Sequence, residues 1–184
     1  MANLPILEIP NPILRKRAKR VRSIDKKMLR IAYDMVDTLN SAGGIGLAAN
    51  QIGQLWRIIV LQMPEEESSR IYFNPEIIKT EGTREVEEGC LSIPNYRGLV
   101  TRSVSIKFQG KDYSDNIVTF KAENLLSQAV EHEVDHLNGI LYTDHLVAHS
   151  ELYRVEELGI SHTNEDSSNN NDDYLNSSST IELK

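Results

Sequence analysis

The stretch AENLLSQAVEHEVDHLNG, residues 122–139, decides how the rest of the sequence is interpreted. Its apolar residues recur at helical spacing and no helix breaker occurs before Gly139, which predicts a long helix with a glycine C-cap. Four residues turn a helix by about 400°, so His132 and His136 share one face, about 6 Å apart along the axis. Two imidazoles in this arrangement can bind one metal ion. Glu133 lies about 100° away and can act as a base on water beside the ion.

A catalytic metal site of this kind needs a third protein ligand and one open position. Metallopeptidases commonly take that ligand from downstream, where the candidates are His145, His149, Glu151, Glu156 and Glu157. Cys90, upstream, is the better candidate, because a thiolate binds divalent metals tightly and the metal drives deprotonation of the thiol. Considered alone, Cys90 would be interpreted as buried packing. For the HExxH stretch, the alternative to a metal site is a helix with a solvated His/Glu face.

The composition indicates a globular chain of one domain. It has 184 residues, of which 40% are hydrophobic and 26% are charged. No apolar run approaches the roughly 18 residues of a membrane helix, and the N-terminus has no signal-peptide pattern, so we expect a cytoplasmic protein that binds neither membrane nor DNA. The net charge is −7, of which residues 162–184 carry −4 (five acids and one lysine), and the mildly acidic remainder argues against general nucleic-acid binding. The basic run RKRAKRVR at 15–22 is interpreted as a solvated surface segment, with an RNA or ribosome contact as the alternative.

We expect a single catalytic domain over residues 1–160 and an acidic, Asn/Ser-rich tail over 161–184 that is disordered. A first helix should begin at the N-cap Ser23 and end at Gly43 and Gly44. A short C-terminal helix is expected over 144–158.

Strands are predicted at RIIVLQ (57–62) and at IYFNPEII (71–78), the latter broken by Pro75. The segments VSIKFQG (104–110) and NIVTFKA (116–122) are predicted to form a hairpin. Strands followed by a major helix indicate the α+β class, with antiparallel or mixed sheets packed around the long helix.

A glycine-rich stretch, GIGLAANQIG at 44–53, is expected to open a short helix or strand. It lacks the spacing of a dinucleotide-binding or phosphate-binding loop. Its Gln51 supplies a neutral N–H₂ donor that is suited to a developing oxyanion.

Three motifs together resemble those of the peptide deformylase family: G-x-G-L-A-A-x-Q at 44–51, E-G-C-L-S at 88–92 and H-E-x-D-H-L-x-G at 132–139. The resemblance covers about residues 4–147. It implies a hydrolase that removes the N-formyl group from the N-terminal methionine of new polypeptides and releases formate. It also implies one divalent metal ion per chain, with Fe²⁺ expected and Zn²⁺, Ni²⁺ or Co²⁺ as substitutes. The implied ligands are Cys90, His132 and His136.

The same resemblance implies roles for other residues. Glu133 would be the general base, and Gln51 with the backbone N–H of Leu91 would hold the oxyanion. Arg102 and Asp135 would form a pair that steadies the ligand helix. The N-formylmethionyl nascent peptide would contact Ile45, Gly46 and Arg97, and its methionine pocket would be lined by Ile45, Leu125, Gln128, Ala129 and His132.

The C-terminal region departs from the basic, ribosome-docking helix of some family members, because it is acidic. That leaves the basic segment 15–22 as a substitute ribosome contact, on a chain expected to be monomeric. Two other functions stay open: a zinc metallopeptidase with a downstream carboxylate ligand, and an inactive deformylase homologue that serves as a binding module. The second would be expected to have lost Glu133 or a ligand, and none is lost.

Overall fold

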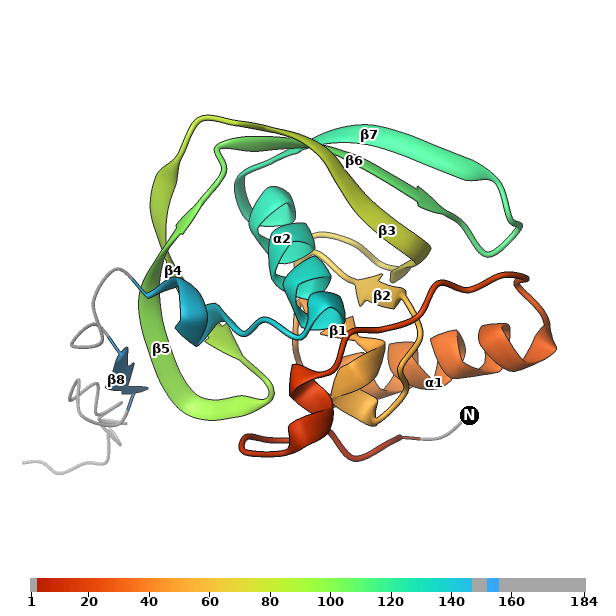
Figure 1. The fold of residues 1–184 in the computed structure, drawn as a ribbon, viewed down its shortest axis with the longest axis horizontal. Coiled ribbons are helices and arrows are strands. Elements are labelled where there is room, and N and C mark those ends of the chain that lie inside the picture. The colour runs from red at the N-terminus through yellow and green to blue at the C-terminus, as the bar shows by residue number, and fades with distance from the viewer. Residues whose placement is uncertain (1–2, 147–151, 156–184) are drawn as a thin grey trace, which may run out of the picture.

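The computed structural model describes residues 3–146 and 152–155. Helix α1 spans Lys26–Ala42 and helix α2 spans Asn124–Asn138 (Figure 1). The strands are β1 Gly46–Ala48, β2 Ile58–Leu61, β3 Arg70–Glu81, β4 Arg84–Cys90, β5 Ile93–Arg102, β6 Ser105–Lys111, β7 Ile117–Glu123 and β8 Leu152–Arg154. The 3₁₀ turns are η1 Pro12–Arg15, η2 Ala49–Ile52 and η3 Tyr142–His145.

The strands form two antiparallel sheets. The larger has the order β1-β2-β3-β6-β7 and the smaller the order β4-β5-β8. The predicted α+β class with antiparallel sheets is confirmed. Both β1 and β4 are edge strands of their sheets, so each has backbone groups on one side that pair with no other described strand.

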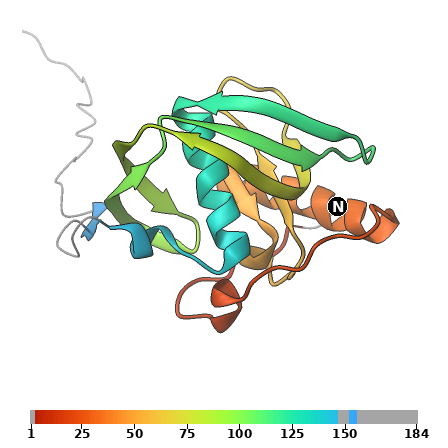
Figure 2. The same ribbon diagram turned by 45° about the horizontal axis from the view of Figure 1, so that its top comes forward.

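Strand β2 lies between the two helices, which explains its continuous apolar sequence. Ile58 and Val60 belong to the buried cluster that α1 covers, whereas Ile59 and Leu61 belong to the cluster that α2 covers. Both views place α2 in the middle of the molecule, between the smaller sheet and the larger one (Figures 1 and 2). Helix α2 can therefore contribute side chains to a site that also includes residues of either sheet.

Two local expectations are corrected. The N-cap of α1 is Asp25, whose Oδ1 accepts a hydrogen bond from the backbone N–H of Met28 at 2.9 Å; Ser23 lies outside the helix. Pro75 does not break β3, because the register shifts between Phe73 and Glu76 and the strand continues past the proline. A bulge of this kind lets a strand keep a residue that cannot donate to the ladder.

The predicted C-terminal helix over 144–158 is wrong where the structure describes it. Leu146 forms an isolated bridge with Val100 of β5, and β8 pairs with the same strand. The backbone N–H and C=O groups of these residues are satisfied by pairing with β5, and this pairing outweighs the helical spacing of their apolar side chains. Residues 147–151 and 156–184, including the predicted tail, lie outside the described residues. Within the described part, no helix is long and apolar enough to cross a membrane.

Candidate metal centre

The last residue of β4 and two residues of α2 bring three ligand atoms together. The Sγ of Cys90 lies 3.2 Å from the Nε2 of His136, and the three ligand atoms of Cys90, His132 and His136 lie within 4.8 Å of one another. Metal–ligand bonds of about 2.0–2.3 Å in a tetrahedron separate neighbouring ligand atoms by roughly 3.5 Å. One thiolate and two imidazoles at these separations fit a single divalent ion of the softer kind.

His132 is oriented by a buried carboxylate. Its Nδ1 lies 2.9 Å from Oε2 of Glu88, which leaves Nε2 for a metal. The guanidinium of Arg102 donates to both oxygens of Glu88, from Nε at 2.8 Å and from Nη2 at 3.0 Å. Burial raises the pKa of Glu88, but the bonds from His132 and Arg102 outweigh it and hold the pKa at about 2. The imidazole of His132, a candidate metal ligand, is therefore held by a charged carboxylate.

Arg102 continues the network to the next turn of α2. Its Nη1 donates to Oδ2 of Asp135 at 2.5 Å, so the pair expected between them is present. The same oxygen lies 2.9 Å from Nε2 of His145. This histidine, one of the downstream ligand candidates, thus contacts a carboxylate outside the cluster. The other downstream candidates lie outside the described residues.

Glu133 lies beside the candidate ligands and is buried, and its Oε2 has no hydrogen-bond partner among the residues that the structure describes. Burial raises the pKa of Glu133 to about 7, against a smaller opposing effect of His132. Its carboxylate packs against the backbone of Gly46, where a Cβ would lie 2.3 Å from Oε1. Only glycine leaves this room, so β1 fixes where the Glu133 carboxylate stands.

Gln51 and Leu91 approach the site from η2 and from the turn after β4. The backbone N–H of Ala48 donates to Oε1 of Gln51 at 2.8 Å, which fixes the amide so that Nε2 faces Ser92 Oγ at 3.2 Å and Cys90 Sγ at 3.7 Å. The side chain of Leu91 rests on Gly44, where a Cβ would lie 2.8 Å from its Cδ1. The three sequence motifs therefore meet in space.

The expected peptide-contacting residues divide into two groups. Ile45 packs against the buried cluster that contains Ala129, and Gln128 is half-buried with its Nε2 donating to the Glu87 carbonyl at 3.0 Å. Leu125 and Arg97 stay at the surface. Arg97 forms an exposed ion pair with the carboxylate of Glu87 at 2.7 Å.

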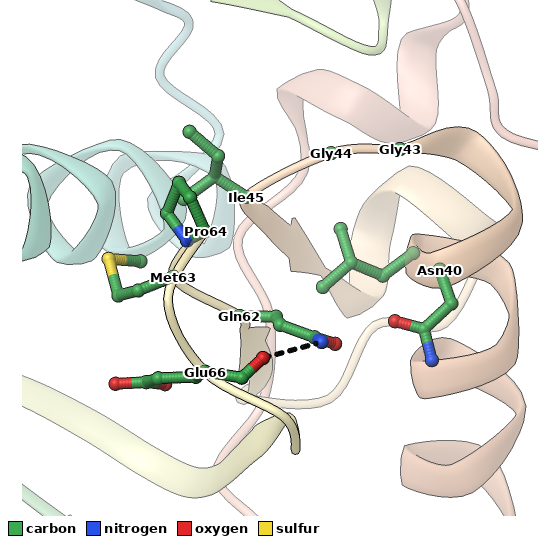
Figure 3. Close-up of a pocket in the computed structure, with 9 residues that line it drawn as sticks. Asn40, Gly43, Gly44, Ile45, Gln62, Met63, Pro64 and Glu66 are labelled. Carbon is green, nitrogen blue, oxygen red and sulfur yellow. Dashed lines mark hydrogen bonds between the residues drawn. The ribbon is translucent and has the colours of Figure 1, made fainter.

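A hollow of about 460 Å³ opens beside Ile45, between the end of α1 and the segment after β2 (Figure 3). Gln62, Met63 and Glu66 line it from the segment after β2, and Nε2 of Gln62 donates to the Glu66 carbonyl at 3.2 Å. It adjoins the glycine-rich motif through Gly44 and is open to solvent.

Sequence reasoning assigned no role to Glu88 or Ser92. Glu88 and Cys90 are two residues apart on β4, where alternate residues share a face, so recognition of this strand would have found Glu88. Ser92 donates its backbone N–H to Cys90 Sγ at 3.4 Å. No sequence pattern signals that contact. A cysteine and two histidines around one point, beside a buried carboxylate, define the candidate site of a metal-dependent hydrolase.

Comparison with known proteins identifies the family. The sequence model of the polypeptide deformylase family matches residues 3–151. The peptide deformylase of Dehalococcoides mccartyi is 44% identical over 155 residues, which are 84% of this chain and 93% of that protein. The crystal structure of a peptide deformylase from Legionella pneumophila is 36% identical with a TM-score of 0.78, over 82% of this chain and 89% of that one.

A peptide deformylase from Synechococcus elongatus, solved in complex with actinonin, is 34% identical with a TM-score of 0.78, over 85% of this chain and 84% of that one. The chain belongs to the polypeptide deformylase family. The enzyme class expected from the three motifs, peptide deformylase, is confirmed.

Proposed function

We propose that Cys90, His132 and His136 hold one Fe²⁺ ion and that the site hydrolyses the formyl group from N-formylmethionyl nascent peptides. The observation that supports this most is the meeting of the three ligand atoms within 4.8 Å, with Glu133 buried beside them. Bound there, a divalent ion supplies a Lewis acid that makes water nucleophilic near neutral pH.

Glu133 moves the proton. Its carboxylate accepts a proton from the attacking water as the water oxygen bonds to the formyl carbon. It then delivers that proton to the α-amino nitrogen as the C–N bond breaks, which releases formate and a free amino terminus. A pKa near 7 suits a group that must both accept and donate, and the contact with Gly46 holds the carboxylate in place.

The developing negative charge falls on the formyl oxygen. The Nε2 of Gln51 and the backbone N–H of Leu91 are the donors proposed for it. Because Oε1 of Gln51 is already bound to the Ala48 N–H, the amide cannot present its acceptor to the substrate instead. This fixed orientation reduces the reorganisation needed when the charge develops.

The peptide is proposed to lie extended between β1 and β4, the edges of the two sheets. In this arrangement Ile45 and Gly46 would contact the peptide from the β1 side, and Arg97 from the β4 side. The methionine side chain is assigned to the region of Leu125, Gln128 and Ala129, where Gln128 is tied to the β4 backbone.

The test compares formyl-Met-Ala-Ser with unformylated Met-Ala-Ser on iron-loaded protein. Formate and shortened peptide fragments are measured separately, because deformylation itself also frees an amino terminus. Formate from the first peptide and no cleavage of either chain are expected. The zinc metallopeptidase alternative requires internal cleavage and metal retention by Cys90→Ser, whereas the proposed function requires that this variant lose the native metal. An inactive binding module would release no formate.

A further inference from the structure

Residues 15–30 concentrate positive charge in an otherwise acidic chain. Nine of the 20 Lys and Arg residues lie in these 16 positions, together with a single acid, Asp25, while the whole chain carries a net charge of −7. Such a reversal of sign over one segment creates a local positive potential that attracts polyanions.

The backbone of this segment is fixed. The N–H of Ala18 donates to the Leu137 carbonyl of α2 at 2.8 Å. Val21 exchanges two hydrogen bonds with the side chain of Asn74, at 2.8 and 2.9 Å. Ala18 and Val21 are buried, and Lys19 between them is exposed. The charged side chains therefore extend from a rigid base, which lowers the entropy cost of ordering them on a ligand.

The segment borders a hollow of about 790 Å³ in front of the N-terminus of α1. We call this the basic groove and define it by Lys19, Arg22, Lys27 and the half-buried Trp56. The one acid in its lining, Asp25, is the N-cap of α1 and accepts a hydrogen bond from the Met28 N–H. None of the three cations forms an ion pair with any residue that the structure describes, whereas their neighbour Arg20 is paired with Glu76. The backbone of Lys19 bridges to Trp56, so the ring and the cations keep a common frame.

We propose that the basic groove binds single-stranded RNA of the ribosome, with phosphates at Lys19, Arg22 and Lys27 and a base stacked on Trp56. Unpaired cations around an aromatic ring are the combination by which proteins hold single-stranded nucleic acid. A flat anionic bilayer matches the charge but does not reach a half-buried ring at the wall of a hollow. The choice of ribosomal RNA rests on the proposed function, since nascent peptides are made there.

Trp56 is the only tryptophan of the chain, so its fluorescence reports on the groove directly. Iron-loaded protein is titrated with a single-stranded uridine RNA of about 12 nucleotides, a length that a stacking surface can accommodate. Quenching that saturates is expected. Three phosphate contacts on a single strand give a slope of about −2 for the logarithm of the binding constant against that of the salt concentration.

The variant Lys19→Glu/Arg22→Glu/Lys27→Glu should bind this RNA at least tenfold more weakly and lose co-sedimentation with bacterial ribosomes. Its formate release from a short formyl peptide should be unchanged, because none of the three residues belongs to the metal centre. The matched control is Lys79→Glu/Lys107→Glu/Lys121→Glu, which changes the net charge equally on three exposed lysines that lie side by side across β3, β6 and β7. It should retain RNA and ribosome binding.

Four outcomes overturn the proposal. The first three are no saturable quenching by RNA at about 50 mM salt, equal losses in the two triple variants, and binding to phosphatidylserine vesicles without binding to RNA. The fourth, a slope near zero on the wild-type protein alone, would do so even if the groove variant failed to fold. Each leaves formate release untouched, so failure of this proposal is distinguishable from failure of the proposed function.

Discussion

The carboxylate of Glu133 on α2 lies against the Cα of Gly46 on β1, so closely that a methyl group at position 46 would stand 2.3 Å from Oε1. Gly46→Ala should therefore displace the carboxylate and lower the rate of formate release by about 100-fold or more. Metal content should stay the same, because Gly46 contacts no ligand. In a Glu133→Ala background the same change should have little further effect, and additive losses would show that Gly46 acts by another route.

Glu88 holds His132, so its charge should matter for metal retention. Glu88→Gln should lower metal affinity by about 10- to 100-fold, measured by competition with a chelator. Glu85→Gln on the same strand is the control, because Glu85 is exposed. Equal affinities in the two variants would contradict the role given to Glu88.

The pKa of Glu88 also predicts how the stability of the metal-free protein depends on pH. The folded value of about 2 lies below the ordinary 4.5, so the carboxylate stabilises the fold fully above about pH 4.5 and loses that effect as the pH falls to 2. The difference in unfolding free energy between wild type and Glu88→Gln, on the order of 3 kcal/mol at neutral pH, should shrink across this window. Urea unfolding at several pH values measures it. A difference that grew on acidification would have the wrong sign.

Gly43 and Gly139 end the two helices with positive φ angles of 64° and 77°. A Cβ at Gly139 would lie 2.5 Å from the Arg15 carbonyl oxygen, whereas one at Gly43 would meet nothing within 4 Å. Gly43→Ala should cost about 1 kcal/mol of backbone strain, and Gly139→Ala clearly more. Thermal unfolding of the pair separates strain from steric clash; equal losses would mean that the Arg15 segment moves freely.

The sequence predicted best where one local pattern decides the structure. The apolar run of β2, the hairpin of β6 and β7 and the glycine ends of both helices are present as expected. The motif residues also meet as a site, although their roles stay predictions.

What the sequence did not predict depends on contacts between distant segments. The hairpin of β4 and β5 has weak alternation, and β8 is a strand because it pairs with β5. The bond from Glu88 to His132 joins residues 44 positions apart. Such contacts follow from the packing of α2 between two sheets. This packing cannot be predicted from the local periodicity of the sequence.

The central claim is that Glu133 acts as the base at an iron site formed by Cys90, His132 and His136. The most direct test measures formate from formyl-Met-Ala-Ser with iron-loaded wild type and with Glu133→Ala, with the metal content of both determined. We predict rapid formate release by the wild type and a loss of about 10²- to 10⁴-fold in the variant at equal metal content. Iron-loaded wild type that releases no formate, or a variant that releases it equally fast, would contradict the claim.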